Sequence, residues 1–215
     1  MEIVKETSMG LWKTALQQIA GKGEEFLDSN GRISREVLNL KSTILKPETD
    51  IEEPINYLRK FDEWIYPSPE EIAGIILNRQ LSPAYTYSYG PRVFSFQSQV
   101  DQIDEYVIPL LRYDKNSRRA YVSIWNPLED SKTFKKLVPG MVGIQFRIKS
   151  GLLHATALVR SNDFFFGWPA NTFQVYTLMK YIAEKTDSSI GTLNTFSLSA
   201  HIFKDEMEHI KKLLQ

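Results

Sequence analysis

Two adjacent arginines are the side chains in this sequence that are best suited to bind a phosphate. Arg118 and Arg119 follow a polar turn at residues 114–117 and begin a segment, 119–125, whose alternating apolar residues predict a strand. The guanidinium group presents paired N–H donors that match the oxygens of a phosphate. The two arginines therefore either clamp a phosphate at the entrance of a strand or form a solvated surface pair.

A second polar group precedes a run of aromatic residues. Residues 160–171 read RSNDFFFGWPAN, so that Arg160, Ser161 and Asp163 lead into the aromatic run. Pro169 fits the first turn of a following helix, and the free N–H groups at a helix start can receive an anion or a base carbonyl. Because buried polar groups must be hydrogen-bonded, these side chains either bind a ligand or satisfy one another as a capped helix with an Arg–Asp pair.

The third candidate is a single histidine, His201, at the end of a predicted strand. A lone histidine in such a place is more often structural than functional. The other two histidines, His154 and His209, show no spacing to it that would build a metal site. We therefore expect no metal.

The elements that position these groups follow from the spacing of the apolar residues. Helical spacing predicts helices at 9–28, 69–79, 99–112, 171–185 and 203–214. Alternation predicts strands at 33–45, 119–125, 142–148, 152–159 and 193–199. This order predicts an α+β fold in which one domain, residues 1–215, holds a sheet of hairpins covered by helices.

Composition excludes several classes of function. Lys plus Arg equals Asp plus Glu, at 26 each, so the chain lacks the basic surplus that non-specific nucleic-acid binding needs. The sequence contains no cysteine, which excludes disulfides, zinc–thiolate sites and a thiol nucleophile. The apolar runs are too short to span a bilayer, and the first ten residues lack the apolar core of a signal peptide. We expect a cytoplasmic protein that binds neither nucleic acid nor membrane.

Taken in order, five segments resemble thymidylate synthase. They read DKNSRRAYVSIWNPLED (114–130), VPGMVGIQF (138–146), RSNDFFFGWPAN (160–171), LMKYIAEKTDSSIGTL (178–193) and SAHIF (199–203). Their order and spacing agree with that family, and the resemblance covers residues 85–203. Upstream, GRISREVLNLK (31–41) is similar to the archaeal and hydroxymethylase branches. The resemblance makes either Arg32 or Arg35 the family's flexible-loop phosphate arginine.

The resemblance implies a thymidylate synthase-like fold whose sheet face is used for dimerisation. Arg118 and Arg119 match the pair that reaches across the interface to the phosphate in the partner's pocket, whereas Arg160 and Ser161 match that pocket's own phosphate ligands. We therefore expect a two-fold homodimer. Its apolar interface is expected on the strand face that carries Val142, Ile144, Phe146 and Ile148.

Four further residues match groups that contact the nucleoside. Asp163 matches the residue that orders the base region, and Asn171 matches the residue that reads the edge of the pyrimidine ring. His201 matches the residue that bonds the sugar hydroxyl, and Tyr89 matches the tyrosine of the family's Tyr-Gly turn. The resemblance thus implies a pyrimidine nucleoside monophosphate as ligand, with uracil preferred because the cytosine branch carries an aspartate in place of Asn171.

One departure from the family decides the chemistry. The family places its nucleophile in a Pro-Cys-His segment before a strand that reads Gln-Phe. Here Gln145 and Phe146 fix the alignment, so Gly140 replaces the cysteine and Met141 the histidine. Since the family adds a thiolate to carbon 6 of the pyrimidine, and glycine has no nucleophile, methyl transfer is not expected.

Other departures affect the sugar and folate contacts. Phe203 stands where the family has a sugar-binding tyrosine, and Val159 replaces a glutamine. The sequence ends soon after His201, where the family has a long segment that folds over the folate, so we expect no folate cofactor. Glu63 and Trp64 are the local candidates for the glutamate and tryptophan that the family supplies to catalysis.

Two classes of function follow from these residues. The first is a protein that binds a pyrimidine nucleoside 5′-monophosphate without transferring a methyl group. The alternative is a thiol-independent enzyme that uses the same pocket, for example to cleave the bond between base and sugar. Such cleavage needs an acid, for which Asp163 or Asp130 is available. A scaffold without a ligand is disfavoured because it gives no reason for so many phosphate-binding and base-binding groups.

Overall fold

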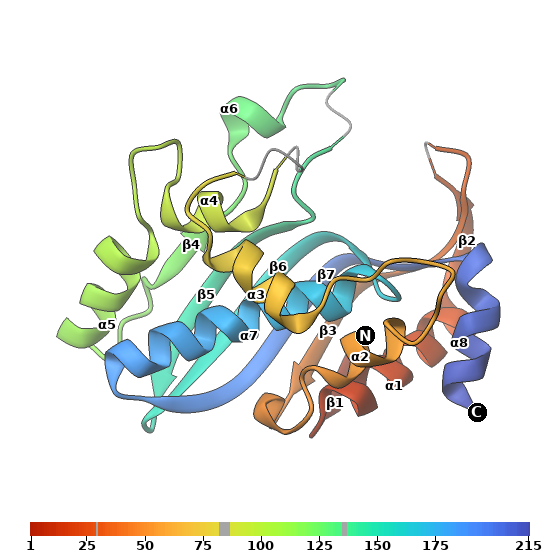
Figure 1. The fold of residues 1–215 in the computed structure, drawn as a ribbon, viewed down its shortest axis with the longest axis horizontal. Helices are drawn as coiled ribbons and strands as arrows, with labels where there is room; N and C mark the ends of the chain where they lie inside the picture. The colour runs from red at the N-terminus through yellow and green to blue at the C-terminus, as the bar shows by residue number, and fades with distance from the viewer. Residues whose placement is uncertain (29, 82–86, 135–136) are drawn as a thin grey trace.

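One mixed sheet of seven strands organises the chain (Figure 1). The computed structural model describes residues 1–28, 30–81, 87–134 and 137–215. Neighbouring strands follow the order β1-β3-β7-β6-β5-β4, and β2 pairs with β3 outside this order. The strands are β1 (Glu2–Lys5), β2 (Glu24–Leu27), β3 (Ile33–Ile44), β4 (Tyr121–Ser123), β5 (Met141–Lys149), β6 (Leu152–Asp163) and β7 (Ser189–Phe203).

Helices pack on this sheet, which confirms the predicted α+β fold (Figure 1). The prediction that the sheet consists of hairpins was wrong, because β6 and β7 are parallel and α7 connects them. The α-helices are α1 (Ser8–Lys22), α2 (Glu53–Leu58), α3 (Pro69–Leu77), α4 (Tyr89–Phe94), α5 (Ile108–Tyr113), α6 (Pro127–Asp130), α7 (Gly167–Thr186) and α8 (Met207–Leu214). Short helical turns lie at Pro47–Thr49, Ile103–Val107 and Lys204–Glu206.

The long helix α7 covers the centre of the sheet. It packs on β5, β6 and β7 and crosses in front of them in Figure 1. Trp168 in its first turn donates a hydrogen bond to Thr195 on β7 at 3.3 Å. Its buried face is built from residues at helical spacing, as the sequence predicts: Val175, Leu178, Met179 and Ile182.

The first helix is shorter than predicted. Residues 24–27 form β2, which pairs antiparallel with β3, so the prediction of a helix over 9–28 was wrong beyond residue 22. Gly23 is the physical reason for the end of α1. Its backbone is extended, and a Cβ built there would lie only 2.5 Å from the carbonyl oxygen of Ile19. Only glycine fits this close approach between helix and strand.

The apolar face of β5 points into the subunit. Ile144, Phe146 and Ile148 are at most 3% exposed. Ile144 pairs with Ala157, and Ala157 pairs with Thr195, which accepts the hydrogen bond from Trp168 of α7. This row of side chains therefore lies on the face of the sheet that α7 covers. These three residues are core residues, and the prediction that they form a dimer interface was wrong.

A bulge separates Val142 from that face. The pairing of β5 with β6 shifts between Met141 and Gly143, and Val142 lies on the opposite side of the sheet with Tyr121 and Leu198. A bulge interrupts the regular alternation of side chains between the two faces of a sheet. A prediction that assumes this alternation therefore assigns residues beyond the bulge to the wrong face. The side of the sheet away from α7 is therefore the one that carries exposed apolar side chains, including Tyr121 and Leu198.

Several predicted elements exist with different bounds. The segment 99–112 is helical only from Ile103, and the strand at 119–125 is limited to β4. β6 extends through Asp163, so the polar group that begins at Arg160 belongs to a strand end and alternates between the two faces. β7 likewise extends through Phe203 and includes His201.

Candidate functional site

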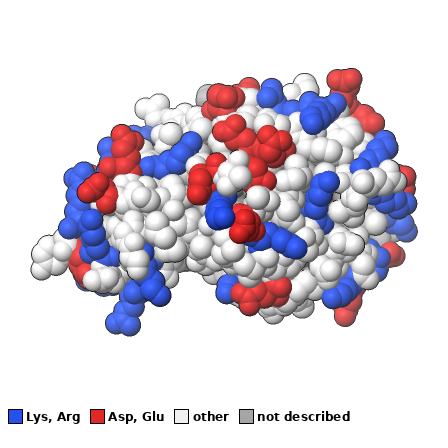
Figure 2. Space-filling model, turned by 90° about the horizontal axis from the view of Figure 1, so that it is seen from below, with Lys and Arg blue, Asp and Glu red and all other residues white. Residues whose placement is uncertain are grey.

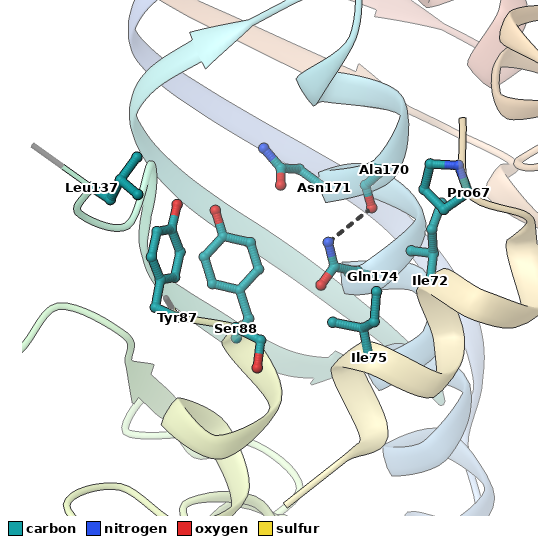
Figure 3. A pocket seen from close by; sticks show the side chains of 10 residues that line it. Pro67, Ile72, Ile75, Tyr87, Ser88, Leu137, Ala170, Asn171 and Gln174 are labelled. Carbon is teal, nitrogen blue, oxygen red and sulfur yellow. Dashed lines mark hydrogen bonds between the residues drawn. The ribbon is translucent and has the colours of Figure 1, made fainter. Parts of the chain in front are cut away.

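A cavity of about 460 Å³ lies between α3, α7 and the start of α4 (Figure 3). Apolar side chains from α3 and two tyrosines form much of its wall, and α7 contributes two amide side chains. A volume of this order suits a small-molecule ligand. The lining residues are Pro67, Ile72, Ile75, Tyr87, Ser88, Tyr89, Leu137, Ala170, Asn171 and Gln174.

Gly140 lies beside this cavity. A Cβ built on Gly140 would lie 3.8 Å from the Tyr89 hydroxyl oxygen and 2.9 Å from the carbonyl oxygen of Ser161. The Tyr89 hydroxyl also accepts a hydrogen bond from the backbone N–H of Met141 at 3.3 Å. The structure thus brings together Tyr89, Gly140 and Ser161, and it leaves little room for a side chain at position 140.

Burial keeps the Tyr89 hydroxyl neutral. Burial and then the neighbouring Tyr87 raise the pKa of Tyr89 above its usual range. A neutral hydroxyl both donates and accepts a hydrogen bond, so Tyr89 can orient a ligand or water in the cavity. It cannot serve as a phenolate base near neutral pH.

Asp163 is fixed at the turn between β6 and α7. Its Oδ1 accepts hydrogen bonds from the backbone N–H groups of Phe165 and Phe166 at 2.9 and 3.0 Å. Trp12 on α1 stacks on Phe165 and donates to the carbonyl of Phe164 at 2.6 Å, which anchors the aromatic run. Aromatic packing and the Asp163 carboxylate therefore set where α7 begins.

Asn171 lies close to Asp163 across a glycine. A Cβ built on Gly167 would lie 3.4 Å from the Asp163 Cβ and 3.9 Å from the Asn171 Nδ2. Asp163 in turn pairs with His201 in the β6–β7 ladder. Asp163, Asn171 and His201 are therefore neighbours, although only Asn171 lines the cavity directly.

Burial shifts the pKa of both Asp163 and His201. It raises the pKa of Asp163, while hydrogen bonds from Phe166 and the charge of His201 act in the opposite direction. Burial lowers the pKa of His201, and the charge of Asp163 opposes this. Each group thus resists being charged alone, which makes the pair sensitive to any further charge placed beside it.

Glu206 is a neighbour of this pair that the sequence analysis did not identify. Its side chain is 4% exposed, and its Oε2 accepts a hydrogen bond from the backbone N–H of Phe203 at 2.9 Å. Burial, and then the charge of Asp163, raises the pKa of Glu206 to about 8. A glutamate three residues after the end of a strand is typical of a capping position, and this spacing was the available signal.

Of the two candidate loop arginines, Arg32 lies near these groups. Its guanidinium stacks on the Phe203 ring at 3.4 Å and binds Asp205 at 2.9 Å. Arg35 instead donates to the carbonyl oxygens of Ala20 and Gly23, at 2.6 and 3.2 Å. Arg35 therefore caps the end of α1.

The three other arginines expected to bind phosphate, Arg118, Arg119 and Arg160, do not line the cavity within one chain. Arg160 lines a separate hollow of about 430 Å³ on the side of the sheet away from α7. Consecutive residues of a strand point to opposite faces of the sheet, so Arg160 faces away from the side on which its neighbours in β6 lie. Arg118 and Arg119 are exposed and lead into the edge strand β4. The hollow around Arg160 is formed with Tyr121, Ser123, Trp125, Pro127, Val142 and Leu198.

The other candidate acids lie elsewhere. Asp130 binds Arg92 at 2.7 Å and does not line the cavity. Glu63 pairs with the Nε2 of His209 at 2.8 Å, and Trp64 donates to the carbonyl of Leu58. These contacts give each of the three residues a structural role.

The described residues also bear on metals, membranes and surface charge. They contain no group of three or more histidine or acidic side chains placed to hold a metal ion. No described helix is long and apolar enough to cross a membrane. Figure 2 shows one face of the molecule, on which basic and acidic side chains are interspersed without a continuous basic surface.

Comparison with known proteins identifies the family. The family model for thymidylate synthase matches residues 43–215. A protein of Methanococcoides burtonii named "Putative thymidylate synthase" is 32% identical over 213 residues, which cover 99% of this chain and 94% of that protein. A protein of the same name from Methanocaldococcus jannaschii is 36% identical over 60% of each chain.

A bacterial protein shows the same relationship. "Thymidylate synthase" of Bacillus atrophaeus is 29% identical over 158 residues, which cover 73% of this chain and 66% of that protein. The range matched by the family model, residues 43–215, includes Gly140, Asp163, Asn171 and His201. This chain belongs to the thymidylate synthase family.

Proposed function

We propose that this protein binds a pyrimidine nucleoside 5′-monophosphate in the cavity beside Gly140 and does not make thymidylate. The observation that carries the proposal is the glycine at the position of the family's nucleophile, beside the Tyr89 hydroxyl and against the Ser161 carbonyl. Thymidylate synthesis needs addition of a thiolate to carbon 6 of the pyrimidine. No cysteine exists anywhere in the 215 residues to provide it.

The base-binding side of the proposal rests on the wall of the cavity. Asn171 lines it and can both donate and accept hydrogen bonds, which suits the N3–H and O4 edge of uracil. Membership of the family supports a pyrimidine nucleotide as the ligand. Asn171→Asp should shift the preference toward cytosine nucleotides, because a carboxylate accepts where the amide donated.

The phosphate-binding side of the proposal involves a second subunit. Arg160, Arg118 and Arg119 lie outside the cavity of one chain. The exposed apolar side chains around Arg160 suit contact with a copy of the same chain. In the proposed homodimer, Arg118 and Arg119 of one subunit and Arg160 of the other bind the same phosphate.

Purified protein tests this proposal in two assays. Thermal unfolding with UMP, dUMP, CMP, dCMP and TMP should show stabilisation by at least one nucleotide. Incubation with dUMP and methylene-tetrahydrofolate should yield no TMP. Stabilisation by none of the five nucleotides, or detectable TMP, would overturn the corresponding half of the proposal.

A second candidate function is favoured by the buried carboxyl groups. Burial raises the pKa of both Asp163 and Glu206, the latter to about 8, so a protonated carboxyl is available near neutral pH. A general acid that cleaves the base–sugar bond needs such a group. Chromatography of each nucleotide after incubation decides the matter, since release of free base supports the enzyme and unchanged ligand supports the binder.

A further inference from the structure

Gln174 is the amide of the cavity wall whose carbonyl oxygen is buried and has no hydrogen-bond partner among the described residues. It lies on α7 one turn after Asn171, so that both side chains emerge on the same side of the helix (Figure 3). Gln174 is 8% exposed, and its side chain points from α7 into the cavity. Its Oε1 is buried and accepts no hydrogen bond from the described part of the chain.

The orientation of this amide follows from its other contact. The Nε2 of Gln174 donates to the carbonyl oxygen of Ala170 at 3.4 Å. The reversed amide would place two oxygen atoms at that distance, which is unfavourable because neither can donate. The nitrogen therefore stays on Ala170, and the carbonyl oxygen is the group left to interact with whatever fills the cavity.

An unsatisfied buried carbonyl imposes a requirement on the ligand. Leaving a buried hydrogen-bond acceptor without a donor costs free energy, so a ligand that donates a hydrogen bond to this oxygen binds more favourably. If water occupies the cavity before binding, a ligand that displaces the water must supply the lost hydrogen bond or bind less tightly. In either case the favoured ligand carries a donor next to Gln174.

The rest of the cavity defines what kind of donor fits. Tyr87 lies across the cavity from the two amides, and Ile75 adds an apolar surface (Figure 3). Tyr89 also lines the cavity, and its ring centroid is 5.9 Å from that of Tyr87. A flat ring between these surfaces presents its polar edge to Asn171 and Gln174. Pyrimidine edges offer two such donors, the N3–H of uracil and the N4 amine of cytosine.

We propose that Gln174 is a specificity-determining residue whose carbonyl oxygen accepts a hydrogen bond from an N–H group on the base edge of the bound nucleotide. This inference rests on the proposed function and adds a second reader of the base. Asn171 then needs only to donate, to O4 of uracil or to N3 of cytosine. The pair of amides recognises a donor and an acceptor side by side.

The test compares three proteins by titration calorimetry: the wild type, Gln174→Met and Thr177→Val. Methionine keeps the size of glutamine and removes its carbonyl oxygen. Thr177 is the matched control, because it is buried one turn further along α7, bonds only the carbonyl of Phe173 in the described residues, and lines no described cavity. Thermal unfolding confirms that each variant folds, and Gln174→Leu replaces the methionine variant if that one does not.

The probes are UMP, 3-methyl-UMP, in which the N3–H is blocked, and CMP. If the donor is the N3–H, wild type should bind 3-methyl-UMP at least about tenfold more weakly than UMP. If it is the N4 amine, wild type should bind CMP at least about tenfold more tightly than UMP, and the expected preference for uracil is then wrong. In both cases Gln174→Met should weaken the binding of the preferred nucleotide and bring the ratio of the two dissociation constants below about threefold. Thr177→Val should keep the wild-type ratio.

The outcomes separate this inference from the function on which it rests. If wild type binds UMP or CMP and Gln174→Met leaves both affinity and ratio unchanged, the inference is wrong and the proposed function stands. If wild type binds no pyrimidine nucleotide, both fail. Loss of affinity in Gln174→Met with an unchanged ratio would show a packing role only and would also overturn the inference.

Discussion

Gly140 illustrates how a single position decides what this site can do. The cavity, the Tyr89 hydroxyl and Asn171 are compatible with binding a pyrimidine, but the position from which the family attacks carbon 6 has no side chain. The backbone is also adapted to glycine, because the Ser161 carbonyl occupies the space where a Cβ would project. The local packing therefore favours glycine at this position.

Replacing this glycine by cysteine should not create a thymidylate synthase. Gly140→Cys supplies a thiol, yet Met141 still stands in place of the family's histidine, and the 2.9 Å approach to Ser161 forces the backbone to shift. We expect no TMP from dUMP and a loss of about 1–3 kcal/mol in the free energy of unfolding. Gly74→Cys is the control, because a Cβ there meets no atom within 4 Å. Measurable turnover, or equal stability of the two variants, would contradict this account of position 140.

Glu206 should make stability depend on pH. Its pKa is about 8 in the folded chain against 4.5 ordinarily, so the folded state holds more protons than the unfolded state between these values. Stability therefore falls as the pH rises from about 4.5 to 8. Glu206→Gln should remove this slope and be more stable than wild type at pH 8 by at least about 1 kcal/mol, given about 1.4 kcal/mol per pKa unit.

Urea unfolding of both proteins at pH 5, 6.5 and 8 measures this effect. Glu208→Gln serves as control, because Glu208 lies two residues further along, on α8, and is 75% exposed in its pair with Lys211. Parallel pH profiles for wild type and Glu206→Gln would show that Glu206 is not the group responsible.

At the scale of elements, strand alternation and helical spacing predicted most of the fold, and single backbone events account for the failures. β3, β6 and β7 and the buried face of α7 follow from the pattern of apolar residues. The end of α1 was missed because Phe26 fits a helical spacing as well as a strand, whereas the close approach at Gly23 depends on β3. The bulge after Met141 leaves no trace in the alternation, so Val142 was assigned to the wrong face.

The same limits apply to the site. The family resemblance assigned Tyr89, Gly140 and Ser161 to one pocket, and these three residues lie close together in the structure. Glu206 and Gln174 were not predicted, since their importance comes from burial and from a missing partner, which no local pattern encodes. Sequence spacing could still have drawn attention to Gln174, three residues after Asn171 on a predicted helix.

The cap of α1 provides a prediction for an element. Arg35 donates to the carbonyls of Ala20 and Gly23, and it joins the end of α1 to β3. Arg35→Ala should lower the free energy of unfolding by about 1.5–3 kcal/mol, the range for hydrogen bonds to charged groups. The exposed Arg59→Ala should change it by less than about 0.5 kcal/mol. Chemical denaturation measures both, and equal effects would show that Arg35 is not a cap.

At the scale of the whole molecule, the separation of the arginines from the cavity is the observation behind the proposed homodimer. Arg160 lies on the side of the sheet away from α7, and Arg118 and Arg119 lead into the edge strand β4. In the proposed assembly, a phosphate site that uses all three joins two chains related by a two-fold axis. The predicted dimer thus uses the side of the sheet opposite to the one that the alternation of β5 suggested.

Complementation tests this assembly. Arg118→Ala/Arg119→Ala and Arg160→Ala should each bind nucleotide poorly as homodimers. After joint unfolding and refolding, about half of the dimers are mixed, and each mixed dimer has one pocket with all three arginines intact. Tight binding should return at about a quarter of all sites. If mixed dimers form and binding does not return, the arginines do not cooperate across subunits.

The most direct test of the central claim is titration calorimetry of the wild-type protein with UMP, dUMP, CMP, dCMP and TMP. We predict saturable binding of at least one of these nucleotides, with one site per chain and a preference for uracil. Asn171→Ala should weaken that binding by about 0.5–1.5 kcal/mol, the value of a neutral hydrogen bond. The absence of binding for all five nucleotides in an assembled, folded sample would contradict the claim that this member of the family has kept its nucleotide site.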